Sequence, residues 1–419
     1  MPYLDYAASA PLRPEALAAM LPLLERPAAN PSSQHGPGRA ARAAVETARE
    51  QVAALVGAAP SQVVFTSGGT EADNLAVKGS VLAREPGARH LVASAVEHHA
   101  VLHAAEWAVA EAGGSLDLAP VDQAGRVDLD GLAAALRPGQ TALVAVMAAN
   151  NEVGTGQPVA GAAELAHQAG ALLLCDAVQA AGSPGVDLAG DGVDLLALAA
   201  HKLGGPTGVG ALVVRPGLDL HPLLHGGGQE RGLRSGTMPA AALAGFGAAA
   251  DLARAERASH GARLTRLRER LLGALLRAEP ALVVNGDPGG DAGSPRRASL
   301  PGLLSVRFPG RRAEDLLLLL DRAGVACSSG SACASGAVSA SHVLLAMGRG
   351  PAEARETIRF SLGWGSTEAD VDETGAAIRD ALAVLPASAA PSEAREARSP
   401  GAREAMSPAA HEAPAGGVR

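Results

Sequence analysis

The segment LLALAAHKLGGPTGVGALVV, residues 195–214, shows the alternation that decides the fold. An apolar run typical of a buried strand ends at Ala199, and His201, Lys202 and a loop rich in glycine and proline follow it. Further apolar runs stand at 141–147 and 171–175, with a helical pattern between them. Strands that alternate with helices in this way predict an α/β domain with a mainly parallel sheet.

Lysine is rare in this chain, since Lys78 and Lys202 stand against 33 arginines. Arginine stays protonated, whereas a desolvated lysine can lose its proton and attack a carbonyl carbon. Either lysine could also have been retained by chance. Lys78 is expected near a helix C-terminus, where a solvated lysine is ordinary. Lys202 follows a predicted strand, so it is the better candidate for chemistry.

Two further motifs lie where a predicted strand ends. SGGT, residues 67–70, precedes a helix, and such a turn either binds an anion through backbone N–H groups or is simply a tight turn. Asp176 follows a buried strand and could hold a ligand cation or cap a helix. An anion site, a carboxylate and Lys202 together match the needs of pyridoxal phosphate.

Two loops and a histidine group leave alternatives open. The glycine-rich loop 226–237 has two arginines and need not bind anything. The small-residue segment 327–342 carries two cysteines, and a thiol there is a nucleophile, a carrier or inert. Its Cys-x5-Cys spacing does not suit zinc, and one helix cannot point His98, His99 and His103 at one ion, so no metal site is predicted.

Composition excludes several classes of protein. The formal net charge is −8 and no long basic run occurs, so direct nucleic-acid binding is not expected. No apolar run approaches the roughly 20 residues of a membrane helix, and no export signal is evident. Three sparse cysteines do not make a disulfide framework, which favours a reducing cytoplasm. The tail 386–419 is rich in alanine, proline and charge and is predicted to be disordered.

Many motifs of the chain occur in the order found in cysteine desulfurases. They are YLDYAASAP, NPSSQHGPGRAAR, VVFTSGGTEADNLAVKG, EHHAVL, NNEVGTGQP, CDAVQAAG, AHKLGGPTGVGAL, GGGQERGLRSGT, SSGSACASG, SHVL and IRFSLG. From about Tyr3 to Leu385 the chain therefore resembles these pyridoxal-phosphate enzymes of the class V aminotransferase superfamily.

This resemblance implies the aspartate-aminotransferase-like transferase fold, known as fold type I. Residues 14–255 would form a large α/β domain that binds pyridoxal phosphate. Residues 1–13 and 256–385 would form a smaller α+β domain that carries the loop with Cys333.

The resemblance also implies which residues hold the cofactor. Lys202 would form the Schiff base, Asp176 would pair with the ring nitrogen, and Gln179 would bond the phenolic oxygen. His98 would stack on the ring and move protons. The other contacts would come from Gly69, Thr70 and His201 at the phosphate, from Asn151 beside the ring and substrate, and from Thr237, which would reach the cofactor phosphate of the partner subunit.

The implied activity is the conversion of L-cysteine to L-alanine. Arg359 would bind the substrate carboxylate, and Cys333 would be the nucleophile that takes up the sulfur as a persulfide. The enzyme would be a cytoplasmic homodimer that passes sulfur to an acceptor protein. The acceptor would be an iron–sulfur scaffold or a tRNA-thiolation enzyme. The motif SSGSAC is similar to that of the subgroup that supplies sulfur for iron–sulfur clusters and tRNA thiolation.

The sequence departs from the family pattern in three places. Ser9 and Ala10 stand where two threonines are common, and Leu174 and Cys175 stand where His and Val are common. Ala199 replaces a serine three residues before the lysine, which removes one expected hydrogen bond from the phosphate cup.

Two other functions compete with the desulfurase. Another class V enzyme, such as a selenocysteine lyase or an aminotransferase, would share the cofactor site, although most aminotransferases need no nucleophilic thiol. A non-catalytic scaffold would have no need of Lys202 and Cys333 together.

Replacing Lys202 with alanine should abolish the visible absorbance of the bound cofactor and all turnover. Lys78→Ala, the matched control, should keep both, because Lys78 is expected on a solvated helix end. Borohydride reduction followed by peptide mapping checks the assignment, and a pyridoxyl label on Lys78 would refute it.

Overall fold

The computed structural model describes residues 1–25, 29–183, 190–287, 299–329 and 340–387. The predicted nucleophile Cys333 and nearly all of the predicted disordered tail lie outside these ranges. Within them, no helix is long and apolar enough to cross a membrane.

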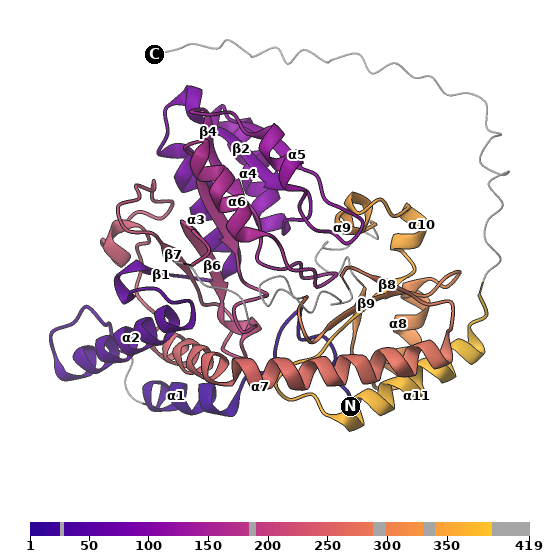
Figure 1. Ribbon diagram of the computed structural model, residues 1–419. Helices are drawn as coiled ribbons and strands as arrows, with labels where there is room; N and C mark the ends of the chain where they lie inside the picture. The colour runs from indigo at the N-terminus through magenta and orange to yellow at the C-terminus, as the bar shows by residue number, and fades with distance from the viewer. Residues whose placement is uncertain (26–28, 184–189, 288–298, 330–339, 388–419) are drawn as a thin grey trace, which may run out of the picture.

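A sheet of seven strands forms the centre of the larger part of the molecule (Figure 1). Its order is β1-β7-β6-β5-β4-β2-β3; β7 runs antiparallel to both of its neighbours, and all the other neighbouring pairs are parallel. The mainly parallel sheet is therefore confirmed. The strands are β1 (Val63–Thr66), β2 (His90–Ser94), β3 (Ser115–Ala119), β4 (Thr141–Ala145), β5 (Leu172–Asp176), β6 (Leu195–Ala199) and β7 (Gly210–Val214).

Helices cover both faces of this sheet, which explains why its central strands are apolar throughout. One buried cluster joins the sheet to α3 (Gly69–Leu82) and α4 (His99–Ala112). The cluster on the other face adds residues of the remaining helices of this part. They are α1 (Pro14–Leu24), α2 (Gly36–Leu55), α5 (Leu129–Ala135), α6 (Val159–Gln168) and the first half of α7.

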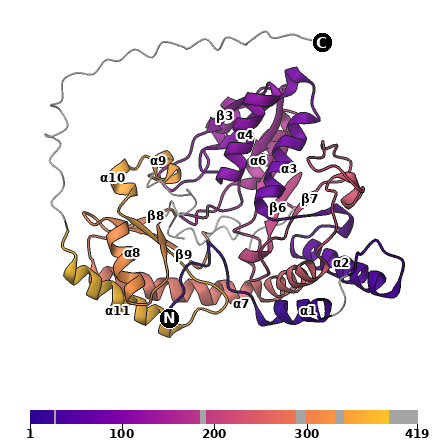
Figure 2. The same ribbon diagram turned by 180° about the vertical axis from the view of Figure 1, so that it is seen from behind.

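The helix α7 (Ala240–Ala278) runs without interruption along the base of the molecule (Figure 2). The sequence around Ser259–Gly261 predicts a break in this helix, and that prediction is wrong, because the helix continues through these residues. A glycine costs about 1 kcal/mol in a helix interior, and packing outweighs that cost here. Gly261 is itself buried, and α7 packs against α1 and α2 over one half and against α11 over the other.

A smaller antiparallel sheet, ordered β10-β11-β9-β8, lies against the second half of α7. Its strands are β8 (Val283–Asn285), β9 (Leu303–Arg307), β10 (Ser328–Ser329) and β11 (Thr357–Ser361). The helices of this part are α8 (Ala313–Arg322), α9 (His342–Ala346), α10 (Pro351–Ala354) and α11 (Glu368–Val384).

The N-terminal segment joins this smaller part. Tyr3 and Asp5 make single bridges to Ala326 and Ser361, and Leu4 belongs to the same buried cluster as α11. On α7, the core of the larger part reaches Ala253. The core of the smaller part begins at Leu264. The division at 255/256 stays a prediction.

Candidate active site

Loops at the carboxyl ends of β1, β2, β4, β5 and β6 enclose a cavity of about 190 Å³. Ligands of open parallel sheets bind at this edge, because the following loops converge there. Eight of the predicted site residues line the cavity: Gly69, Thr70, His98, Asn151, Asp176, Gln179, His201 and Lys202.

The N-terminus of α3 supplies one wall of the cavity. Its N-cap is Gly68, which has no side chain to accept hydrogen bonds from the first N–H groups of the helix. A Cβ on Gly69 would lie 2.6 Å from Val178 Cγ2, so only glycine lets the turn come this close to the loop after β5. The first N–H groups of the helix and its dipole favour an anion at this wall.

Two polar side chains, Asp176 and Gln179, lie at the end of β5 and in the loop after it. Asp176 is 6% exposed and accepts a hydrogen bond of 2.9 Å from Val178 N. Burial raises the pKa of its carboxyl, while that hydrogen bond and Lys202 act in the other direction. Gln179 Oε1 is buried with no hydrogen-bond partner among the described residues. A ligand that brings a cation to Asp176 and a donor to Gln179 would satisfy both groups.

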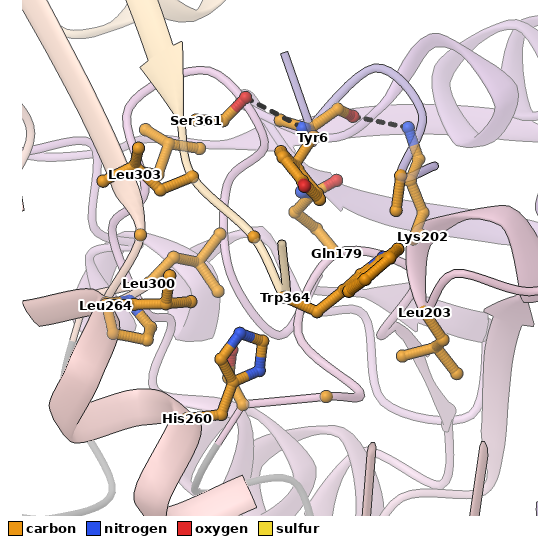
Figure 3. Close-up of a pocket in the computed structure, with 18 of the residues that line it drawn as sticks. Tyr6, Gln179, Lys202, Leu203, His260, Leu264, Leu300, Leu303, Ser361 and Trp364 are labelled. Carbon is orange, nitrogen blue, oxygen red and sulfur yellow. Dashed lines mark hydrogen bonds between the residues drawn. The ribbon is translucent and has the colours of Figure 1, made fainter. Parts of the chain in front are cut away.

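Lys202 reaches across to the N-terminal segment. Its Nζ donates to Ala7 O at 2.5 Å and to Ala8 O at 2.7 Å. Figure 3 shows this side chain together with Gln179 at the edge of a second, smaller cavity, which continues toward Trp364 and His260. Lys202 and Gln179 line both cavities, so the lysine stands between them.

Two histidines in the cavity are neutral near pH 7. Burial, reinforced by the charge of Lys202, lowers the pKa of His98 to about 4 and that of His201 to about 4. His98 caps α4, and its Nδ1 accepts from Ala100 N at 3.1 Å. The proton of the neutral ring therefore lies on Nε2, which is a donor.

Three predicted site residues do not line the cavity. Arg359 is buried, and its guanidinium donates to Asn151 O and to Asp5 Oδ1, both at 2.9 Å. Its Nε has no partner within the described part of the chain. Thr237 is exposed and lies on a separate apolar groove. Cys333 falls outside the described residues.

Sequence reasoning missed two buried acids. Asp73 lines the cavity, and Glu97 accepts from Met147 N at 2.7 Å. Burial, and then the charges of Asp176 and Glu97, raises the pKa of Asp73 well above its usual range. Burial likewise raises the pKa of Glu97 to about 8. Asp73 stands four residues after Gly69, one helical turn further on the same face, and this spacing was the available signal.

These residues fit pyridoxal phosphate. The uncapped N-terminus of α3 suits the phosphate, and the buried Asp176 suits a protonated ring nitrogen. The side-chain amide of Gln179 would bond the phenolic oxygen of the ring, with its Nε2 as the donor. Lys202 is the lysine of the cavity and can bond the aldehyde.

Comparison with known proteins agrees with this geometry. The sequence model of the aminotransferase class-V family matches residues 2–374. An IscS-like cysteine desulfurase of Mycobacterium tuberculosis is 43% identical over 93% of this chain and 96% of its own. A cysteine desulfurase of Cereibacter sphaeroides is 47% identical over 88% of this chain and 92% of its own. A solved NifS-like protein, 34% identical, superposes with a TM-score of 0.83 over 91% of this chain and 99% of its own.

Ala199→Ser should tighten cofactor binding. Ala199 ends β6 and lines the cavity, and a Cβ on Gly69 would lie 3.6 Å from its Cβ, so a serine here adds a donor beside the anion site. A hydrogen bond to a charged group contributes roughly 1.5–3 kcal/mol, which corresponds to about 10- to 100-fold in affinity.

The dissociation constant is measured from cofactor absorbance in dialysed protein. The control is Ala171→Ser. Ala171 is buried and directly precedes the first residue of the neighbouring strand β5, at the end of that strand away from the cavity. An unchanged constant in Ala199→Ser would mean that water or Ser67 already fills the gap.

Proposed function

The chain belongs to the class-V aminotransferase family, and from its similarity to cysteine desulfurases over nearly its whole length we propose that it is itself a cysteine desulfurase. It is a pyridoxal-phosphate-dependent enzyme, as the family is. The observation that carries this function is the convergence of Lys202, Asp176 and the α3 N-terminus on one cavity.

The surroundings of each cavity residue suit a particular role in binding the cofactor. Bound pyridoxal phosphate supplies an electron sink that stabilises negative charge at the α-carbon of an amino acid. Asp176 would keep the ring nitrogen protonated, and Gly69, Thr70 and His201 would hold the phosphate. Lys202 would anchor the cofactor through its aldehyde carbon. The neutral His98 would stack on the cofactor ring, and its Nε2–H is the hydrogen-bond donor of that side chain.

Arg359 is the proposed site of the substrate carboxylate. It is held in place from two sides, by Asp5 and by the backbone oxygen of Asn151. Its buried Nε is the N–H that a carboxylate would satisfy. Because Asn151 also lines the cavity, the substrate would lie between these two residues and the cofactor.

The proposed reaction moves one sulfur atom without an added oxidant or reductant. The Cys333 thiolate attacks the sulfur of L-cysteine, so that an S–S bond forms as the Cβ–S bond breaks. The bonding electrons stay with the substrate carbon, which takes up a proton. The products are L-alanine and a persulfide on Cys333.

The two described cysteines are unsuited to this attack. Burial raises the pKa of the Cys327 thiol to about 12, with a further contribution from Asp5. Cys175 is fully buried, and burial raises the pKa of its thiol well above the usual range. Only a thiolate is a good nucleophile, so neither competes with Cys333 near pH 7.

The assembly and the acceptor are parts of the same proposal. Thr237 lies on an apolar groove of about 680 Å³ between α1, the start of α2 and the start of α7. A second copy of the chain would cover this groove and receive Thr237 at its cofactor phosphate. The persulfide would pass in the cytoplasm to an iron–sulfur scaffold or a tRNA-thiolation enzyme.

Cys333→Ser should bind the cofactor but release no sulfide from L-cysteine and leave no persulfide on the protein. Cys327→Ser should form alanine and sulfide at nearly the normal rate, because its thiol is not ionised. Alanine and sulfide are measured together. Loss of persulfide in Cys327→Ser with full activity of Cys333→Ser would overturn the assignment.

Mixed dimers test the shared site. Lys202→Ala and Thr237→Ala, refolded together, should regain activity, because one site then combines an intact Lys202 with an intact threonine from the other chain. Lys202→Ala mixed with Asp176→Ala should regain none, since both residues serve their own chain. A fully active monomer in light scattering would eliminate the shared site.

A further inference from the structure

Glu71 stands in an unfavourable place for the proposed cofactor. It lies in the first turn of α3, whose N-terminus is the proposed phosphate site. Its Oε2 accepts from Ser67 N at 2.7 Å and so holds the turn that leads into the helix. A carboxylate in this turn favours the helix, but it also repels a phosphate dianion bound at the same end.

Arg234 is the direct partner of this carboxylate. Its Nε and Nη2 donate to the two oxygens of Glu71 at 2.9 and 3.3 Å. The side chains are only 17% and 18% exposed, so water screens the pair poorly. Burial opposes ionisation of Glu71, but the hydrogen bonds from Arg234 and Ser67 outweigh it and lower its pKa.

The loop that carries Arg234 is fixed to the strand ahead of the same turn. Glu230 receives two hydrogen bonds from Arg49, at 2.8 and 2.9 Å, and one of 2.7 Å from Phe65 N in β1. Glu230 and Arg231 both have positive φ, 47° and 58°, a conformation that non-glycine residues seldom adopt. The buried ion pair offsets this strain, so the position of Arg234 is imposed by the fold.

We propose that Arg234 is a positioning residue that cancels the charge of Glu71, so that Glu71 can hold the Ser67 turn without repelling the cofactor phosphate. This inference rests on the proposed function, because it assumes that pyridoxal phosphate binds at the α3 N-terminus.

A second role for Arg234 has to be separated from this one. The same loop continues to Thr237, so loss of Arg234 could also displace that residue from the partner's site. The two roles differ in what happens when Glu71 is neutralised as well. Charge compensation predicts rescue, whereas anchoring of the loop predicts no rescue, because the contact between Glu71 and Arg234 stays broken in the double variant.

The experiment measures the dissociation constant of pyridoxal phosphate for dialysed protein, by cofactor absorbance, in four variants and the wild type. Arg234→Gln should bind roughly tenfold more weakly. Arg234→Lys loses the two-pronged contact but keeps the positive charge beside Glu71, so it should bind within about threefold of the wild type. Glu71→Gln should bind at least as tightly as the wild type, and Glu71→Gln/Arg234→Gln should return to within about threefold of it.

Two further measurements keep the result interpretable. Arg254→Gln removes an arginine from an exposed ion pair with Asp251 and should leave the constant unchanged. Thermal-shift titration of cofactor-free protein with inorganic phosphate should give the same order of variants and shows that each is folded.

A double variant as weak as Arg234→Gln, or an Arg234→Gln protein that binds like the wild type, would overturn the inference. A wild-type protein that binds no pyridoxal phosphate would instead overturn the proposed function.

Discussion

The close approach of the turn before α3 to the loops of the neighbouring strands is the constraint on which the site depends. A Cβ on Gly210 would lie 2.5 Å from Leu198 O and 2.6 Å from the carbonyl carbon of Gly68. A Cβ on Gly69 would collide with Val178 in the same way. Glycine at these positions lets the N-terminus of α3 face the end of β6, and Lys202 follows directly from there.

Three buried acids lie in or near the cavity, which Asp176 and Asp73 line. Asp176, Asp73 and Glu97 are all nearly inaccessible to water, and burial raises the pKa of each. His98 and His201 are neutral for the same reason and give no compensating charge. A protonated cofactor ring against Asp176 would therefore stabilise the ionised form of that residue.

The N-terminal segment joins the two parts of the molecule at the site. Asp5 holds Arg359 of the smaller sheet, and the carbonyls of Ala7 and Ala8 hold Lys202 of the larger part. Ser361 Oγ also accepts from Ala7 N at 2.9 Å. The arginine proposed to bind the substrate and the lysine proposed to bind the cofactor thus share one short stretch of chain as their support.

The sequence alone determined the features that depend on neighbouring residues. Apolar runs and the loops after them established the parallel sheet, and SGGT, Asp176 and Lys202 followed because a residue after a strand must lie at the edge of that sheet. Only the tertiary structure decided the pairing of Arg234 with Glu71 and of Arg359 with Asp5, which join residues 163 and 354 positions apart. It also carried α7 through Ser259–Gly261, where the local sequence predicts a break. Local patterns do not encode such contacts, because distant segments meet only when the whole core packs.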